Sequence, residues 1–129
     1  MVEITTLDGQ VIEASDSSIV LIAGPYPHDV GPHTYVYGVT PAVLVTGEAP
    51  DALIARLNIN PLLARLTRPN QTSVWIKGAA VTSLRRPVST EITNPGEVNA
   101  IVNIGSLHQA VRETVETARS IINALGGKV

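Results

Sequence analysis

The fold is decided by residues 6–25, TLDGQVIEASDSSIVLIAGP, and by residues 67–87, TRPNQTSVWIKGAAVTSLRRP. Each stretch contains a strand-like segment, turn residues and an apolar run, so the two resemble degenerate copies of one unit. Three matched pairs carry the alignment: Ile19 with Val81, Ile22 with Leu84, and Pro25 with Pro87. An internal repeat constrains the whole architecture, and it is therefore the first feature to interpret.

Each copy closes with a segment that favours a helix, VLVTGEAPDALIARL at residues 43–57 and QAVRETVETARSI at residues 109–121. Glu48 and Asp51 in the first segment align with Glu113 and Glu116 in the second. Carboxylates at these positions favour the positive end of a helix dipole. We expect helices over residues 48–57 and 113–125, the first with Thr46 as its N-cap.

The rest of each copy has the patterns of short strands. Asp8-Gly9 is a strong hairpin signal, because glycine tolerates the positive φ that such turns require. The strands expected from alternation or apolar runs cover residues 2–7, 11–14, 19–23, 34–38, 42–46, 62–67, 73–77, 79–84, 98–104 and 107–111. The predicted fold class is α+β, with two tandem β-meander-plus-helix repeats, residues 1–60 and 61–129, packed into one compact unit.

Composition limits the core and the compartment. Hydrophobic residues make up 44% of the chain, yet it has no Phe and one Trp, which predicts an aliphatic core. The absence of Cys excludes disulfides and thiolate metal sites. No apolar run approaches the roughly 18 residues of a membrane span, and Met-Val-Glu lacks the basic start of a signal peptide. We therefore expect a cytoplasmic protein that does not insert into membranes.

Charge is divided unevenly along the chain. Residues 1–60 hold seven acidic residues against Arg56 alone, a formal charge of −6, whereas residues 61–129 hold eight basic residues against four glutamates, a formal charge of +4. Unlike surfaces that meet head to tail produce rings or filaments, whereas two-fold dimers pair like surfaces. This asymmetry indicates a homo-oligomer in which one copy meets the opposite copy of a neighbouring chain, and it also suits a different protein as partner.

The motifs of enzymes are missing from the sequence. No serine lies in a G-x-S-x-G elbow, and no glycine-rich phosphate cradle is present. The carboxylate pairs at the predicted helix starts are explained by capping and by the helix dipole. His28, Asp29 and His33 have metal-ligand side chains, but structural zinc sites usually bring four defined ligands. The sequence thus predicts no catalytic residue, no metal, no cofactor and no enzymatic activity.

A contact surface is predicted around one strand and the loop before it. If Val36 points inward, Tyr35 and Tyr37 share the outer face, and tyrosine is enriched at protein interfaces. The preceding loop, residues 24–33, is rich in proline and glycine and adds further contact candidates. The predicted interface consists of Tyr26, His28, His33, Tyr35 and Tyr37 in the first copy against Arg85 and Arg86 in the second.

The second copy resembles a known family through residues 73–87, SVWIKGAAVTSLRRP, and residues 98–122, VNAIVNIGSLHQAVRETVETARSII. These stretches are similar to the FlbD-like family of small bacterial proteins. The resemblance implies a non-enzymatic accessory or assembly component associated with the flagellum or the cell envelope. The first copy keeps the LDG turn and the apolar third strand, but it lacks the tryptophan and the V-R-E segment.

An alternative function follows from the first twenty or so residues. Their strand, D-G turn and strand also resemble the start of an Sm-like or SH3-like small barrel, a class that binds nucleic acids. The cations available to neutralise phosphates are Arg65, Arg68, Lys77, Arg85 and Arg86. Because the chain is acidic overall and has few aromatic stacking platforms, with Trp75 expected to cover one end of the core, we favour protein partners over nucleic acid.

Overall fold

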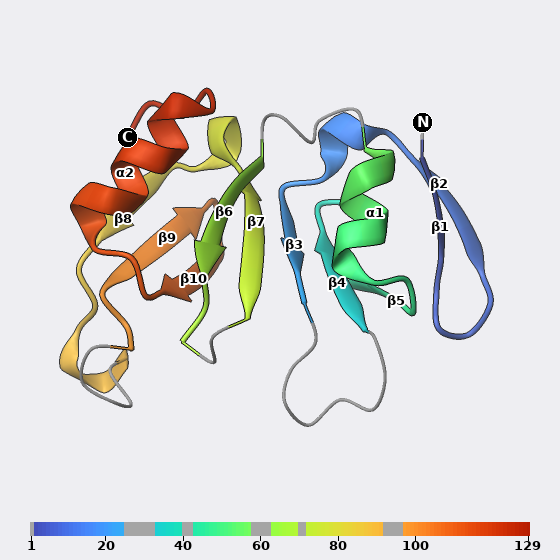
Figure 1. The fold of residues 1–129 in the computed structure, drawn as a ribbon, viewed down its shortest axis with the longest axis horizontal. Helices are drawn as coiled ribbons and strands as arrows, with labels where there is room; N and C mark the ends of the chain where they lie inside the picture. Colours follow the sequence, from blue (N-terminus) through green and yellow to red (C-terminus); the bar gives the residue numbers. More distant parts are fainter. Residues whose placement is uncertain (1, 25–32, 40–42, 58–62, 70–71, 92–96) are drawn as a thin grey trace. The chain divides into compact units, whose positions relative to one another are not determined.

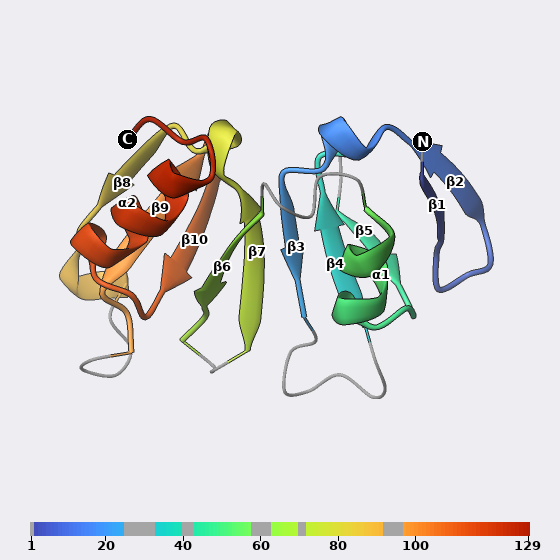
Figure 2. The same ribbon diagram turned by 45° about the horizontal axis from the view of Figure 1, so that its top comes forward.

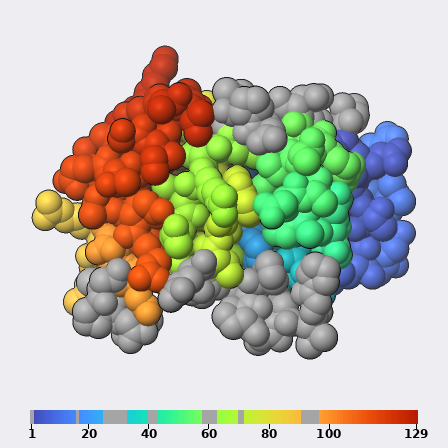
Figure 3. Space-filling view, viewed as in Figure 1, coloured from blue at the N-terminus to red at the C-terminus, as the bar shows by residue number. Residues whose placement is uncertain are grey.

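The computed structural model describes residues 2–24, 33–39, 43–57, 63–69, 72–91 and 97–129, which are coloured in the ribbon and space-filling views (Figures 1 and 3). The chain divides into two compact units, Met1–Pro61 and Leu62–Val129, each with its own strands and one α-helix. The protein therefore has the predicted α+β fold. The boundary between the units lies where the formal charge of the sequence changes sign.

Unit 1 begins with an antiparallel hairpin of β1 (Val2–Thr5) and β2 (Val11–Ala14). The turn is closed by the amide of Gly9, which donates to the carbonyl of Thr6 at 3.0 Å. Gly9 has a φ of +90°, in the left-handed region that favours glycine. The structure thus confirms the hairpin turn that Asp8-Gly9 predicts.

The remainder of unit 1 is a three-stranded meander covered by a helix. Its strands are β3 (Leu21–Ala23), β4 (Thr34–Tyr37) and β5 (Leu44–Thr46), all antiparallel, with α1 (Pro50–Arg56) following. The meander is connected to the hairpin where the end of β1 reaches β5: Thr6 forms a bridge with Thr46, and the Leu7 amide donates to Val45 at 3.2 Å. The hairpin is thereby hydrogen-bonded to the edge strand of the meander.

Unit 2 passes through the same order of elements (Figures 1 and 2). A hairpin of β6 (Leu63–Thr67) and β7 (Ser73–Lys77) is followed by a meander and a helix. The meander strands are β8 (Ser83–Arg85), β9 (Ala100–Ile104) and β10 (Leu107–Val111), and the helix is α2 (Val115–Ala124). In both views α2 lies across the strands of its own unit, which is how a small sheet buries its apolar face.

Two hydrogen bonds outside the strand ladders recur in both units at matched positions. The Thr6 amide donates to the Gln10 carbonyl at 2.8 Å, and the Arg68 amide donates to the Thr72 carbonyl at 2.8 Å. Before the third strand of each unit, the Val20 amide donates to the Tyr37 carbonyl at 3.0 Å, and the Thr82 amide donates to the Asn103 carbonyl at 2.8 Å. These matches support the internal repeat, although duplication of one ancestral unit stays a prediction.

Aliphatic side chains make up both cores. Of the buried hydrophobic residues in the described segments, all are Val, Ile, Leu or Ala. The largest fully buried aliphatic side chains are Ile4, Ile19, Ile22, Val36 and Leu53 in unit 1 and Leu66, Val74, Ile76, Val102, Val111 and Ile122 in unit 2. The aliphatic composition expected from the absence of Phe is confirmed.

Several predicted element ends are wrong, each for a local reason. Thr46 does not cap α1, because it belongs to β5, and the N-cap is Ala49 with no side-chain hydrogen bond. For α2, the N-cap is Thr114, whose hydroxyl accepts from the Thr117 amide at 3.2 Å, so Glu113 precedes the helix.

The strand predicted over residues 79–84 is shorter than expected and starts later. Gly78–Ala80 forms a 3-10 turn instead, and β8 begins at Ser83. Gly78 is buried against the last turn of α2, where a Cβ would lie 2.8 Å from the Leu125 carbonyl oxygen and 2.9 Å from that of Ile122. The chain at Gly78 therefore packs against the end of α2, and strand pairing with β9 begins only at Ser83.

Candidate functional site

The predicted contact residues of unit 1 lie on and beside β4. Val36 is fully buried, whereas Tyr35 and Tyr37 are half-buried on the opposite face of the strand. The condition on which the contact prediction depends, that Val36 points inward, is therefore met. His33 directly precedes β4 and is half-buried, while Tyr26 and His28 lie outside the described residues. A contact role for the two tyrosines stays a prediction.

The predicted contact residues of unit 2 lie at the end of β8. Arg85 is the last residue of the strand and half-buried, and its Nη1 donates to the Arg86 carbonyl at 3.4 Å. Arg86 is exposed. The basic pair thus marks the point where the first strand of the second meander ends.

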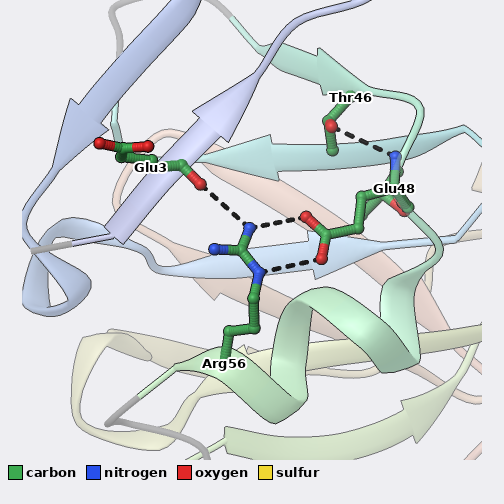
Figure 4. Close-up of polar contacts among 5 residues, drawn as sticks. Glu3, Thr46, Glu48 and Arg56 are labelled. Atoms are coloured by element: carbon green, nitrogen blue, oxygen red, sulfur yellow. Dashed lines mark hydrogen bonds and ion pairs between the residues drawn. The ribbon is translucent and has the colours of Figure 1, made fainter.

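One charged cluster in unit 1 was not expected from the sequence. The guanidinium of Arg56 makes a two-pronged contact with Glu48, with Nε 2.9 Å from Oε2 and Nη2 2.6 Å from Oε1 (Figure 4). Nη2 also donates to the main-chain oxygen of Glu3 at 3.0 Å. The hydrogen bond with the Glu48 carboxylate raises the pKa of Arg56. This cluster ties the end of α1 to β1 and to the segment before the helix.

A surface hollow of about 440 Å³ lies beside this cluster. Its lining is formed by Thr5, Thr6, Leu7, Thr46, Gly47, Glu48 and Arg56. The guanidinium at its edge already donates to Glu48 and Glu3. Fork-like pairs of this kind are geometrically specific, and partly exposed ones contribute about 1 kcal/mol or less. The arrangement therefore stabilises unit 1.

In unit 2, Glu113 also links the segment before the helix to the first strand of its unit, but by different contacts. Its carboxylate accepts from the Thr67 amide, at 2.9 Å and 3.1 Å for its two oxygens, and from the Thr67 hydroxyl at 2.9 Å. The segment before α2 is thereby fastened to β6. Capping does not explain Glu48 and Glu113, which both lie outside the helices, whereas Asp51 and Glu116 do occupy the first turns as predicted.

Replacement of Glu113 by alanine is expected to destabilise the protein by about 1–3 kcal/mol, because the part-buried Thr67 amide loses its acceptor. Glu116→Ala is the matched control, since it removes an exposed carboxylate from the first turn and costs about 1 kcal/mol or less. Urea unfolding followed by circular dichroism measures both changes. Equal losses for the two variants would contradict the role given to Glu113.

The hairpin turn of unit 1 contains a perturbed carboxyl group. The Thr6 hydroxyl donates to Asp8 Oδ1, and the Gln10 amide lies 3.5 Å from the same oxygen. These hydrogen bonds, that of Thr6 foremost, hold the pKa of Asp8 below its ordinary value. Hydrogen bonds to a carboxylate favour its charged form and so lower its pKa.

The Thr6→Val substitution is expected to raise the pKa of Asp8 toward its ordinary value of 3.8. In the native protein the lowered pKa stabilises the fold above the unfolded-state pKa, and this stabilisation is lost as the pH falls through the folded-state pKa. NMR titration of the Asp8 carboxyl in both proteins measures the shift. An unchanged pKa in the variant would show that the hydroxyl does not hold the carboxylate.

The outer face of the β6–β7 hairpin combines a cation with the single tryptophan. Arg65 lies over the ring of Trp75, 5.6 Å from its centroid, and its Nε donates to Ser73 Oγ at 3.1 Å. Val74 and Ile76 are fully buried on the other face of β7. Trp75 is half-buried on the side opposite these core residues, so the expectation that it covers one end of the core is wrong.

A polar row crosses the meander of unit 2. Asn103 on β9 donates from Nδ2 to Ser83 Oγ at 2.9 Å, and its Oδ1 lies 2.5 Å from Nδ1 of His108 on β10. Asn103 therefore separates the hydroxyl from the imidazole. A nucleophilic serine needs its base within direct hydrogen-bond reach, so this row stabilises strand pairing and does not form a catalytic pair.

The β1–β2 hairpin has an acidic face that was not predicted from the sequence. Glu3 lies directly opposite Glu13 in the strand register, and both are exposed. Val11, on the same strand as Glu13, is 57% exposed. The signal was present in the sequence, because the short connection through Asp8-Gly9 sets the register that places the two glutamates side by side.

Neither a metal centre nor a membrane-spanning helix is found in the described part of the chain. Within the ranges that the structure describes, no group of three or more His, Cys, Asp or Glu side chains is close enough to hold a metal ion. His28 and Asp29, named from the sequence as metal-ligand types, lie outside these ranges. None of the described helices is long and apolar enough to cross a membrane.

No family model, curated protein or solved structure matches this chain. The similarity of residues 73–87 and 98–122 to the FlbD-like family thus stays a prediction from sequence.

Proposed function

We propose that this protein is a non-enzymatic interaction protein that self-associates head to tail through its two units. The proposal rests on one observation, that the two structural units have formal charges of opposite sign. Unit 1 holds seven acidic residues against one arginine, a formal charge of −6, and unit 2 holds eight basic residues against four glutamates, a formal charge of +4. Opposite charge on two separate units favours contact between unlike units of neighbouring chains.

Exposed side chains supply this charge in both units. Glu3, Glu13 and Asp51 are exposed in unit 1, and Arg86, Arg119 and Lys128 are exposed in unit 2. Like-with-like contact across a two-fold axis would oppose charges of the same sign. Complementary surfaces instead attract, and they raise the rate at which partners meet.

For the biological setting, we propose a cytoplasmic bacterial accessory or assembly component of the flagellum or cell envelope. The support is the resemblance of residues 73–87 and 98–122 to the FlbD-like family. An assembly that grows by repetition of one contact suits such a structural role.

Self-association is tested by absolute mass, measured by light scattering after size exclusion at about 50 mM and about 500 mM salt. The expected result is a multiple of 13.6 kDa at low salt and a smaller mass at high salt, because salt screens contacts between exposed charges. A mass of 13.6 kDa under both conditions would overturn the proposal. A salt-resistant oligomer would retain self-association but remove its electrostatic basis.

A second candidate function, a small-barrel protein that binds single-stranded nucleic acid, is favoured by one observation. The half-buried Trp75 carries Arg65 over its ring on the outer face of a hairpin, and aromatic and cationic groups together bind single strands by stacking and charge. Because Trp75 is the single tryptophan of the chain, its fluorescence reports binding directly. Quenching by single-stranded RNA or DNA that weakens with salt would support this function, and unchanged fluorescence would contradict binding at Trp75.

A further inference from the structure

We propose that the open edge of β2 in unit 1 pairs with β8 in unit 2 of a second copy of this chain. This inference rests on the proposed self-association and names the strands that would mediate it. In the described part of the chain, β2 pairs with β1 alone and β8 pairs with β9 alone. Unpaired strand edges present rows of main-chain donors and acceptors that accept a further strand.

The hydrogen-bond pattern of the hairpin shows which groups of β2 face outward. Thr6 and Gln10 form a hydrogen-bonded pair, and bonded and non-bonded pairs alternate along an antiparallel ladder. Ile12 consequently bonds to β1, whereas the main-chain groups of Val11 and Glu13 point toward the open edge. Two residues of β2 are therefore able to form main-chain hydrogen bonds with a neighbouring strand.

The side chains beside this edge leave a negative charge to be compensated. Glu13 lies opposite Glu3, and like charges directly opposite one another destabilise a strand pair. Glu3 uses its main-chain oxygen to contact Arg56, and the side chain of that arginine is paired with Glu48. A cation from a partner strand would relieve the repulsion between the two glutamates.

The chain itself carries an edge strand with the complementary charge. β8 is the outer strand of the meander β10–β9–β8 in unit 2, and it ends in Arg85 followed by the exposed Arg86. Pairing of β2 with the β2 strand of another copy would bring Glu13 near its own equivalent. Pairing of β8 with a second β8 would likewise gather four arginines. Charge complementarity thus favours pairing of β2 with β8, and it disfavours pairing of either strand with its own equivalent in another copy.

This choice of strands allows two forms of assembly. Two copies that exchange β2 and β8 reciprocally form a two-fold dimer, whereas copies that use β2 with one neighbour and β8 with another make heterologous contacts. Such contacts generate closed rings when the rotation between copies completes a turn, and open filaments when it does not.

The main-chain part of the proposal is tested with Val11→Pro. Val11 is the first residue of β2 and its amide faces the open edge, a position where proline is tolerated within a sheet. Proline removes the outward donor without breaking the bonds to β1. Light scattering at low salt is expected to show a mass reduced toward 13.6 kDa. The matched control is Val11→Thr, which keeps the amide and the strand preference and should assemble like the native chain.

The electrostatic part is tested by reversing the charge on each strand. Glu13→Arg and the double variant Arg85→Glu with Arg86→Glu should each lose assembly, because their β2 and β8 edges then carry the same sign. A mixture of the two variants should assemble again, since every edge meets an opposite one. Because Glu13 is exposed, its substitution leaves the core intact, and the charge-reversal test still applies if the proline variant fails to fold.

The outcomes separate this inference from the proposed function. A native chain that remains at 13.6 kDa overturns both. A native oligomer whose mass is unchanged by Val11→Pro and by Glu13→Arg retains self-association but overturns the pairing of β2 with β8. Loss of mass in both single variants, with recovery in the mixture, is the result expected.

Discussion

Substitution of alanine for Gly38 is expected to lower the free energy of unfolding by about 2–5 kcal/mol. Gly38 follows β4 and has a φ of +105°, which side chains with a Cβ rarely adopt and which costs roughly 1–2 kcal/mol. A Cβ at this position would also overlap the carbonyl oxygen of Ser18 and lie 3.1 Å from the amide of Val20. Overpacking of this kind adds about 1–3 kcal/mol.

Gly9→Ala is the matched control for this substitution. Gly9 lies in the same unit and also has a positive φ, +90°, but a Cβ there would meet no atom within 4 Å. The control therefore carries the backbone cost without the steric cost. Urea unfolding of both variants measures the difference. If Gly38→Ala were no more destabilising than Gly9→Ala, the close approach of residues 18 and 38 would be wrong.

The contrast between these glycines shows how far the sequence predicts the fold. Gly9 follows an aspartate between two alternating segments, and that local pattern is sufficient to predict its turn. Gly38 is required because the chain at Ser18, far away in sequence, packs against it. Such a contact depends on the tertiary arrangement, and no local pattern carries it.

The helix starts illustrate the same limit. The helical spacing of Val115, Ala118, Ile122 and Leu125 predicts the apolar face of α2. Ala118 and Ile122 are fully buried, whereas Val115 and Leu125 are half-buried. Thr46 has the residue type of an N-cap, yet it is part of β5 and pairs with Thr34 across the sheet. Tertiary strand pairing therefore overrides the local capping preference, and the helix begins at Pro50.

The candidate interaction site was predictable in its charge but not in its geometry. The formal charges of −6 and +4 are read from the sequence, and the unit boundary of the structure coincides with the change of sign. Which strands have open edges is a property of the topology, however. The residue types of Tyr35 and Tyr37 predict a contact surface, whereas the open edge of β2 depends on the register of Val11 and Glu13.

Ile122→Ala is expected to destabilise the protein by about 2–5 kcal/mol, the cost of a cavity at a fully buried aliphatic side chain. Ile122 lies in the last turn of α2, where its carbonyl accepts from the amides of Leu125 at 3.1 Å and Gly127 at 3.0 Å. A Cβ on Gly127 would collide with the Cγ2 of Ile122, so the chain after the helix packs directly on this side chain. The cavity would therefore loosen both the helix and its C-terminal turn.

A graded series distinguishes the cavity from a general weakening of α2. Ile122→Val removes one methylene group and should cost about 0.5–1.5 kcal/mol. Ser120→Ala changes an exposed position of the same helix and should be within about 0.5 kcal/mol of the native protein. Urea unfolding of the three variants measures the series. Similar losses of unfolding free energy in all three variants would mean that α2 does not pack on the core of unit 2 through Ile122. The burial of Ile122 instead predicts a loss that increases from Ser120→Ala through Ile122→Val to Ile122→Ala.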